Sequence, residues 1–212
     1  MATLLYIETS PRKADSASSQ IAATFVETYT QVNPNDTIET MDVWSMKLPE
    51  FDGDVLEAKY AALRGQERTP EQDAAWTEIS AIAARVRSAD KLLISVPMWN
   101  FGIPYKFKHL IDAISQKDLL FTFTEAGFNG LVTHAKAAVV YARGVDYAPT
   151  TTFDTPAAAW DQQKPYVDLW LRFIGITDVA SIVAEKTLMG PEASESTLRH
   201  AHEEAKGLAR VF

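Results

Sequence analysis

The sequence predicts an α/β fold in which a doubly wound, five-stranded parallel sheet carries helices on both faces. Five short apolar runs are separated by longer segments in which apolar residues recur at helical spacing. The chain has 212 residues, of which 47% are apolar and 23% are charged, as in ordinary globular proteins. This length suits one α/β domain, so we expect residues 1–212 to form a single domain.

The apolar runs are the expected strands. The first, LLYI, ends before Glu8, and the third, KLLISV, ends at Pro97, where the missing amide hydrogen interrupts a strand. The second run alternates polar and apolar side chains, which is typical of a strand. The five expected strands span residues 4–7, 37–43, 91–96, 136–141 and 179–184.

The helical segments between the strands begin at recognisable signals. Thr69-Pro70-Glu71-Gln72 is a capping box with proline at the first helical position. Pro104, Thr155-Pro156 and Pro191 precede three further amphipathic patterns. The helix expected from Ser18 carries apolar side chains at Ile21, Phe25, Val26, Tyr29 and Val32.

The composition excludes several kinds of site. With 28 acidic and 20 basic residues the net charge is −8, and the chain lacks the Lys/Arg cluster that nucleic-acid binding needs. It has no cysteine, which excludes disulfides and thiolate metal sites. The longest uncharged stretch, residues 92–105, is too short to span a bilayer, and the N-terminal residues lack a signal-peptide pattern. We therefore expect a cytoplasmic protein that binds no membrane, nucleic acid or metal.

The loop after the first expected strand, ETSPRKADSASSQ, is rich in hydroxyl groups and leads into a helix. The hydroxyls of Ser10, Ser16 and Ser18, with the free N–H groups of a first helical turn, are the donors that a phosphate monoester needs. Ser16 or Asp15 would equally suit an ordinary helix cap. The loop by itself therefore leaves phosphate binding and capping open. It has neither the G-x-G-x-x-G dinucleotide fingerprint nor the G-x-S-x-G nucleophile elbow.

Two aromatic residues, Trp99 and Phe101, stand in the loop after the third expected strand, beside Asn100 and Gly102. A planar aromatic ligand would cover these rings, and Asn100 could hydrogen-bond its polar edge. Gly102 would permit a close approach of the backbone. Packing of both rings into the core is the alternative explanation.

A third signal, Arg143-Gly144, follows the fourth expected strand. It supplies a cation and a permissive backbone, although a solvated arginine beside a turn glycine is the ordinary interpretation. In doubly wound sheets, ligands bind outside the carboxyl ends of the strands. Because all three loops follow strands, together they predict one ligand-binding crevice.

These segments resemble those of the FMN-dependent NADH:quinone oxidoreductases, also called FMN-dependent NADH-azoreductases, which have a flavodoxin-like fold. The resemblance covers nearly the whole chain, and the ordered set of motifs is more specific than any one of them. The matching segments are Ser10 with Ser16-Ala17-Ser18, the loop PMWNF from Pro97, and the runs FKHLIDAI, FTFTEAGFNGLV and FIGITDV.

The resemblance implies a single FMN-binding domain and a set of cofactor contacts. It places Ser10, Ser16, Ala17 and Ser18 at the FMN phosphate. It places Pro97, Met98, Trp99, Asn100 and Phe101 along one edge of the isoalloxazine, and Ala142, Arg143, Gly144 and Val145 at its pyrimidine end. The family commonly has Ser-Arg-Gly-Gly in the last loop, whereas this chain has alanine first and valine last, and valine disfavours a positive φ.

The resemblance also implies the reaction. NADH would deliver hydride to bound FMN, and a quinone or an aromatic azo compound would then take two electrons in the same pocket. We assign no catalytic side chain. Phe121, Phe123 and Phe128 lie where the family has aromatic residues near the substrate, although core packing explains them equally well. The family forms homodimers whose second chain completes the pocket, so we expect a homodimer that acts on small aromatic acceptors.

Three other functions are open to a chain of this kind. An electron-transfer flavodoxin has no substrate of its own and binds phosphate in a compact Thr/Ser-Gly-x-Thr turn, whereas here five residues without glycine separate Ser10 from Ser16. A quinone or chromate reductase of the same fold would prefer NADPH. A relative that has lost FMN would account for Ala142 and Val145.

Overall fold

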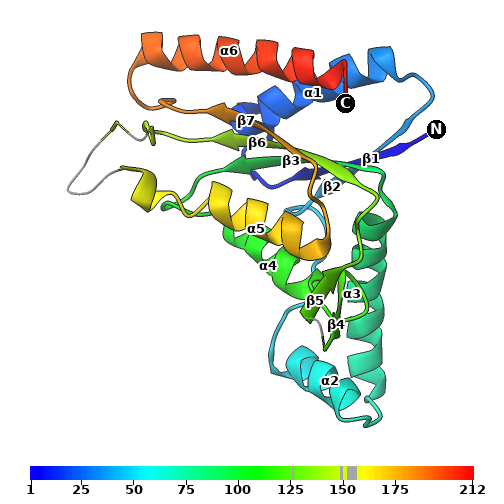
Figure 1. Cartoon of the computed structure of the whole chain (residues 1–212). Coiled ribbons are helices and arrows are strands. Elements are labelled where there is room, and N and C mark those ends of the chain that lie inside the picture. The colour runs from blue at the N-terminus through cyan, green and yellow to red at the C-terminus, as the bar shows by residue number, and fades with distance from the viewer. Residues whose placement is uncertain (126, 149, 152–156) are drawn as a thin grey trace.

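A computed structural model describes residues 1–125, 127–148, 150–151 and 157–212. Its centre is a parallel five-stranded sheet with the order β2-β1-β3-β6-β7 (Figure 1). The strands are β1 (Thr3–Glu8), β2 (Thr37–Asp42), β3 (Lys91–Pro97), β6 (Lys136–Ala142) and β7 (Val179–Ala184). All five expected strands and the flavodoxin-like architecture are confirmed, because this is the flavodoxin strand order.

Helices cover both faces of the sheet. Helices α1 (Ala17–Val32) and α6 (Pro191–Ala209) lie together on one face, and α4 (Tyr105–Ile114) and α5 (Lys164–Ile174) lie on the other (Figure 1). Helix α3 (Pro70–Ser88) starts at the expected capping box and packs with α2 (Gly53–Leu63) in an arm that extends away from the sheet. No helix within the described ranges is long and apolar enough to cross a membrane.

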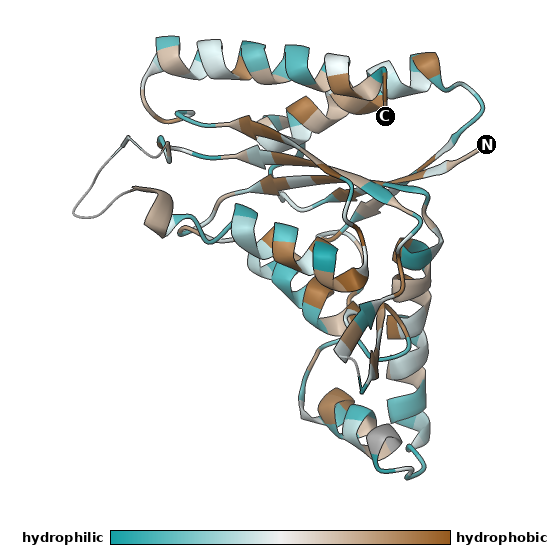
Figure 2. Cartoon of the chain, in the orientation of Figure 1, coloured by the Kyte–Doolittle hydropathy of each residue, from teal (hydrophilic) through white to brown (hydrophobic). Residues whose placement is uncertain are grey.

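Alternating side chains of each strand divide the core into two layers. In β1, Leu4 and Tyr6 pack beneath α1 and α6, whereas Leu5 and Ile7 pack against the α3–α5 side. Both faces of the central strands are therefore apolar, which is why these strands are unbroken apolar runs in the sequence (Figure 2). Burial of each of these aliphatic side chains stabilises the folded state by roughly 1.5–3 kcal/mol relative to leaving it exposed.

Two features differ from the sequence-based expectation. A hairpin of β4 (Phe121–Thr124) and β5 (Gly127–Gly130) stands apart from the main sheet. Its two short strands, in which polar and aromatic side chains alternate, are not among the five strands that the sequence predicts. The helix start expected at Thr155-Pro156 lies outside the described residues. In this part of the chain a 3-10 turn, η2 (Ala157–Trp160), precedes α5.

The strand register aligns the three candidate loops at one edge. Glu8 pairs with Ser95, and Pro97 pairs with Ala142, so the carboxyl ends of β1, β3 and β6 are neighbours. Parallel strands lie about 4.8 Å apart, which separates the first and third loops by only about 10 Å. The fold thus brings together what the sequence places more than 130 residues apart, since the loops begin at Thr9 and Arg143.

Candidate functional site

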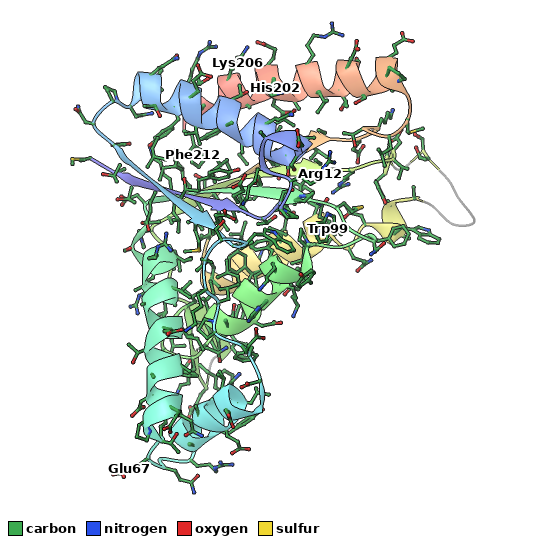
Figure 3. All side chains as sticks on the ribbon, turned by 180° about the vertical axis from the view of Figure 1, so that it is seen from behind. Arg12, Glu67, Trp99, His202, Lys206 and Phe212 are labelled. Carbon is green, nitrogen blue, oxygen red and sulfur yellow. The ribbon has the colours of Figure 1, made fainter. Side chains whose placement is uncertain are left out.

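The candidate site lies at the carboxyl edge of the sheet. Arg12, just before α1, and Trp99, just after β3, both lie at this end of the molecule (Figure 3). Three groups of residues form the site: the hydroxyl-rich segment at the start of α1, a tight turn after β3, and the loop after β6.

The hydroxyl groups of the first loop are buried together. Ser10, Ser16 and Ser18 are 1%, 4% and 0% exposed. Ser10 Oγ accepts a hydrogen bond from the Arg12 amide (3.3 Å), which leaves its own hydrogen to donate. The Ser16 and Ser18 hydroxyls bond each other at 3.1 Å. A polar cluster of this density costs free energy unless it is satisfied, and an anion supplies the missing acceptors.

The N-terminus of α1 bears on the choice between capping and phosphate binding that the sequence left open. Ser16 occupies the N-cap position, but its side chain makes no capping hydrogen bond in the described part of the chain. The first turn of a helix presents free N–H groups and the positive end of the dipole. The geometry therefore favours anion binding over simple capping, with Ala17 contributing its backbone.

Lys13 closes the same loop by ion pairing. Its ammonium contacts Glu8 Oε2 at 3.1 Å and also pairs with Asp42 Oδ1, so it joins the ends of β1 and β2. Burial acts to lower the pKa of Lys13, but the hydrogen bonds that its ammonium donates to Asp42 and Glu8 outweigh burial and raise that pKa. Burial likewise acts to raise the pKa of Asp42, yet bonds from Lys13, Ser45 and the backbone lower it. Lys13 thus offsets part of the negative charge of two carboxylates beside the hydroxyl cluster.

The loop after β3 is a tight, strained turn. Trp99 and Gly102 exchange both backbone hydrogen bonds at 3.0 Å, and the two central residues have positive φ, 46° at Asn100 and 71° at Phe101. These are the features of a type I′ turn, which usually contains glycine or asparagine. Gly102, which the sequence suggested for close approach, has little role in this, because its Cβ would meet only Trp99 O at 3.9 Å.

A cavity of about 430 Å³ opens between this turn and the loop after β6. It is lined by Met98, Asn100, Phe101, Gly144, Val145, Tyr147 and Trp160. Trp99, by contrast, packs against Trp44 and Tyr105, with ring centroids 5.8 and 6.4 Å away. Of the two aromatic residues singled out in the sequence, Phe101 is in the cavity wall and Trp99 belongs to a neighbouring aromatic cluster.

The loop after β6 forms without unusual backbone geometry. Neither Gly144 nor Val145 is among the described residues with positive φ, so valine meets no conformational obstacle there. Gly144 instead allows close packing against Leu188, because a Cβ at this position would lie 2.7 Å from Leu188 Cδ1. Ala142 ends β6 and accepts a hydrogen bond from the Met98 amide at 2.8 Å. This bond joins the loops that follow β3 and β6.

Sequence reasoning missed two cavity residues, Tyr147 and Trp160. Tyr147 belongs to the same loop as Arg143 and could have been found there. Burial, ahead of the nearby charges, raises the pKa of Tyr147, so its phenol stays protonated at neutral pH and can donate a hydrogen bond. Trp160 comes from η2 and meets the Phe101 ring at 5.0 Å, a contact that only the tertiary fold creates.

Together these groups fit FMN. A phosphate would meet buried hydroxyls and the start of a helix, and a planar ring would enter the cavity between two turns. The cavity-lining side chains include no carboxylate, imidazole or amine among the described residues, which suits an apolar, uncharged ring. The arrangement offers binding and orientation more readily than acid–base catalysis.

Comparisons with known proteins give the same assignment. A family described as having a flavodoxin-like fold matches residues 2–208. A protein of Burkholderia lata named FMN-dependent NADH:quinone oxidoreductase 9 is 50% identical over 212 residues, the full length of both chains. A Pseudomonas fluorescens protein named FMN-dependent NADH:quinone oxidoreductase 3 is 43% identical, covering 99% of this chain and 97% of its own.

Solved structures extend the comparison. An azoreductase from Bacillus anthracis has a TM-score of 0.90 with 27% identity, and the alignment covers both chains completely. A second structure from that organism, an FMN-dependent NADH-azoreductase in complex with FMN, has a TM-score of 0.85 and 28% identity, covering 99% of this chain and 100% of the other.

Proposed function

This chain belongs to the flavodoxin-like FMN-dependent NADH:quinone oxidoreductases, and from that membership we propose that the crevice at the carboxyl edge of its sheet is where FMN binds and reacts. The protein is an FMN-dependent enzyme that uses NADH to reduce quinones and azo compounds. The observation that carries the site assignment is the buried hydroxyl cluster at the start of α1, where Ser16 makes no capping hydrogen bond in the described part of the chain. The cluster lies at the same edge of the sheet as the cavity between the loops after β3 and β6. The proposed unit is one FMN-binding domain spanning residues 1–212, working in the cytoplasm, where NADH is available.

The phosphate end is held by neutral donors. Ser10, Ser16 and Ser18 hydroxyls and the amides that follow Ser16 would donate to the phosphate oxygens, with the helix dipole adding favourable charge. Lys13 reduces the repulsion between the phosphate and the nearby carboxylates of Glu8 and Asp42, because it offsets part of their negative charge. The phosphate therefore anchors the cofactor without requiring a direct cation.

The ring end is held by the two turns. Met98, Asn100 and Phe101 form one wall of the cavity, and Gly144 and Val145 form the other. The strained turn would expose backbone N–H groups and the Asn100 carboxamide toward the polar edge of the ring. Pro97, Trp99 and Ala142 act behind these walls, since they fix the ends of β3 and β6 and the base of the turn.

When bound, FMN supplies the redox chemistry, accepting hydride from NADH and passing two electrons to a quinone or azo compound. The residues that line the cavity would orient the ring and the substrate that enter it. Tyr147 lines the cavity, and its phenol, protonated at neutral pH, would be a hydrogen-bond donor there. Protons consumed in the reaction come from solvent, since no ionised side chain lines the described cavity wall.

The enzyme is proposed to act as a homodimer. Phe123 and Phe128 on the hairpin are 57% and 63% exposed, and Leu169 on α5 is 64% exposed. Phe128 also packs on Phe173 with centroids 5.5 Å apart, which joins the hairpin to α5. An apolar surface of this kind suggests a protein interface, and a second copy of the chain is the partner that the family resemblance implies.

The dimer is tested by sedimentation across a range of concentrations. Phe123→Ser with Phe128→Ser should shift the equilibrium toward monomer and lower quinone reduction. Val211→Ser is the matched control, because it also removes an exposed apolar side chain (79% exposed) but near the C-terminus. A wild-type monomer at micromolar concentration would rule out the dimer.

The enzymatic function is tested with purified protein reconstituted with FMN. We expect a yellow protein that oxidises NADH only when a quinone or an azo dye is added, with slower turnover on NADPH. A protein that stays colourless after FMN is supplied would contradict the proposed site. A protein that holds FMN but reduces no acceptor would instead indicate an electron-transfer flavodoxin.

A further inference from the structure

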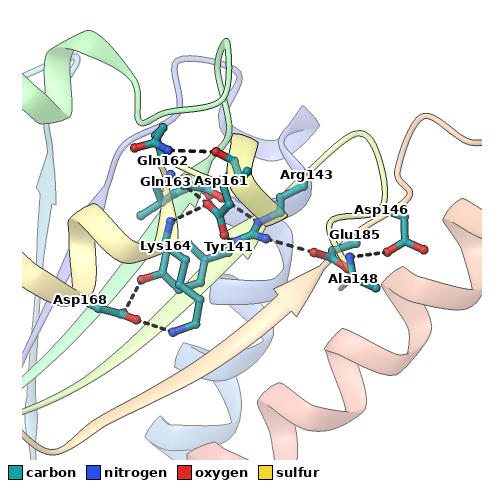
Figure 4. A network of polar contacts seen from close by, with 12 residues as sticks. Tyr141, Arg143, Asp146, Ala148, Asp161, Gln162, Gln163, Lys164, Asp168 and Glu185 are labelled. Carbon is teal, nitrogen blue, oxygen red and sulfur yellow. Dashed lines mark hydrogen bonds and ion pairs between the residues drawn. The ribbon is translucent and has the colours of Figure 1, made fainter. Parts of the chain in front are cut away.

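Arg143 stands at the carboxyl end of β6, yet its side chain turns into the protein and is only 4% exposed. Nε donates to Gln163 Oε1 at 3.0 Å and Nη1 donates to Glu185 Oε1 at 3.0 Å. Nη2 lies 2.8 Å from Asp161 Oδ2 but makes no hydrogen bond within the described ranges, so this contact is an ion pair. In Figure 4 the guanidinium lies between Asp161 and Gln163 on one side and Glu185 on the other.

Asp161 and Gln163 form the start of α5. Asp161 Oδ1 accepts hydrogen bonds from the amides of Gln163 (3.0 Å) and Lys164 (3.1 Å), and so satisfies the first turn of the helix. Gln163 Nε2 donates to Val96 O at 2.8 Å. Through these two residues, Arg143 connects the start of α5 to the ends of β3 and β6, while its bond to Glu185 adds the end of β7.

The same segment supports the strained turn. The Gln162 amide donates to Phe101 O at 2.9 Å, and the Trp160 ring meets the Phe101 ring at 5.0 Å. An aromatic residue at a φ of 71° is strained, and such conformations persist only where surrounding contacts enforce them. Residues 160–163 supply those contacts, and Arg143 holds residues 161 and 163 in place.

Resting on the proposed function, we propose that Arg143 is a positioning residue for the isoalloxazine ring, which acts by clamping both walls of the cavity and not by touching the ring with its side chain. One wall, the strained turn, is held through Asp161 and Gln163. The other is held directly, because the guanidinium lies 5.4 Å from the centre of the Tyr147 ring and Arg143 O accepts bonds from Thr187. The sequence suggested a free cation here, but all three guanidinium nitrogens face protein acceptors.

Two variants weaken the contacts between Arg143 and the start of α5 while keeping the charge or the helix cap at the substituted position. Arg143→Lys keeps the positive charge, but a single ammonium cannot replace the planar fork that reaches three acceptors. Asp161→Asn keeps the Oδ1 atom that caps α5 and removes the ion pair. Lys186→Met is the matched control, since it removes a cation of the neighbouring loop that pairs with Asp146 at 2.8 Å on the surface.

The first readout needs no cofactor. In FMN-free protein, amide hydrogen exchange at Gln162 should be at least tenfold faster in Arg143→Lys and Asp161→Asn than in the wild type and in Lys186→Met. Ile79→Val, a buried change in α3, controls for general loss of stability and should leave exchange at Gln162 unchanged relative to its neighbours.

The second readout compares FMN affinity with turnover, and so separates binding of the phosphate from positioning of the isoalloxazine ring. FMN affinity should change less than threefold in Arg143→Lys, because the phosphate is held elsewhere, whereas kcat for NADH-dependent quinone reduction should fall about 10- to 100-fold, as expected for a reactant displaced by about 1 Å. Asp161→Asn should show the same split, and Lys186→Met should stay within twofold of wild type.

Two results would overturn the proposal. Unchanged exchange at Gln162 combined with weakened FMN binding would mean that the arginine contacts the cofactor directly. Wild-type exchange and turnover in Asp161→Asn would mean that the clamp has no role, and this variant decides the matter if Arg143→Lys does not fold. A wild-type protein that oxidises no NADH would refute the proposed function, whereas exchange in the FMN-free protein still tests the clamp.

Discussion

The double substitution Ser16→Ala with Ser18→Ala should separate phosphate binding from folding. The two hydroxyls bond each other at 3.1 Å and are both buried. Removing both partners of a buried hydrogen bond leaves no orphaned group, so the FMN-free protein should unfold within about 1 kcal/mol of wild type. Each hydroxyl that donates to a phosphate contributes about 1.5–3 kcal/mol. The pair therefore accounts for at least about 3 kcal/mol of FMN affinity, or about a 100-fold change in Kd.

The change of about 100-fold in Kd for FMN also predicts a difference in thermal stability. With FMN at about 1,000 times the wild-type Kd, binding stabilises the protein by about 4.1 kcal/mol. At the same concentration the variant has only about ten times its Kd and gains about 1.4 kcal/mol. The FMN-induced rise in melting temperature should therefore be smaller by roughly 5–10 °C for a chain of this size.

Riboflavin supplies the control, because it has the ring and ribityl chain of FMN without the phosphate. Fluorescence titration of FMN-free protein should show that wild type and variant bind riboflavin equally and differ only toward FMN. An equal loss toward both ligands would mean that the hydroxyls shape the loop and do not contact phosphate. Unchanged FMN affinity would refute the phosphate assignment altogether.

Three further changes test neighbouring parts of the site. Lys13→Met should cost about 0.5–1 kcal/mol of unfolding free energy at pH 7, a small value because the lysine is 39% exposed. Because the pKa of Asp42 is lowered in the folded state, this difference should begin to shrink as pH falls below about 4 and vanish once pH has fallen through the lowered pKa. Because the pKa of Lys13 is raised, the difference should persist up to about pH 10.4 and be lost as pH rises through the raised pKa, and a constant difference in urea unfolding across pH would contradict this. Phe101→Gly should leave the unfolding free energy within about 1 kcal/mol of wild type, because relief of the positive φ at this position offsets the lost contact with Trp160. Quinone turnover should fall in the same variant. A loss of more than about 2 kcal/mol of unfolding free energy would argue against backbone strain at Phe101. Asn100→Gly keeps the turn geometry and removes only the carboxamide, so turnover should fall several-fold with the melting temperature unchanged, and unaltered kinetics would exclude a role for the amide.

The central strands β1, β3 and β6 were predictable because they are buried on both faces and are therefore unbroken apolar runs, whereas the edge strand β2 was predicted from its alternation. The predicted ends agree with the structure to within one residue at every carboxyl end. Because ligands bind outside the carboxyl ends of the strands in doubly wound sheets, the positions of the strands alone then indicated the three candidate loops. The hairpin of residues 121–130 gave a weaker signal, because each strand is only four residues long and much of its surface is exposed.

Details of the site depend on contacts that a local pattern cannot encode. Asn100 and Phe101 have positive φ because Gln162 and Trp160, some 60 residues later, hold them there. The sequence pointed instead to Gly102, the residue with the greatest intrinsic freedom. Capping and phosphate binding use the same residue types at the start of a helix, so only the observed hydrogen bonding of Ser16 distinguishes them.

Two cations of the loops at this edge, Lys13 and Arg143, have one physical role in common. Lys13 pairs with Glu8 and Asp42, and Arg143 pairs with Asp161 and Glu185. Each cation faces two carboxylates, so neither cluster has positive charge left over for a ligand. In the proposed site, a chain of net charge −8 would thus bind an anionic cofactor through buried hydroxyl and amide groups, while Lys13 and Arg143 hold the loops that carry these groups. Neutral donors are less sensitive to ionic strength than an exposed ion pair is. Neutral donors must also be placed accurately to be effective, and the ion pairs of Lys13 and Arg143 and the strained turn hold the loops at this edge in place.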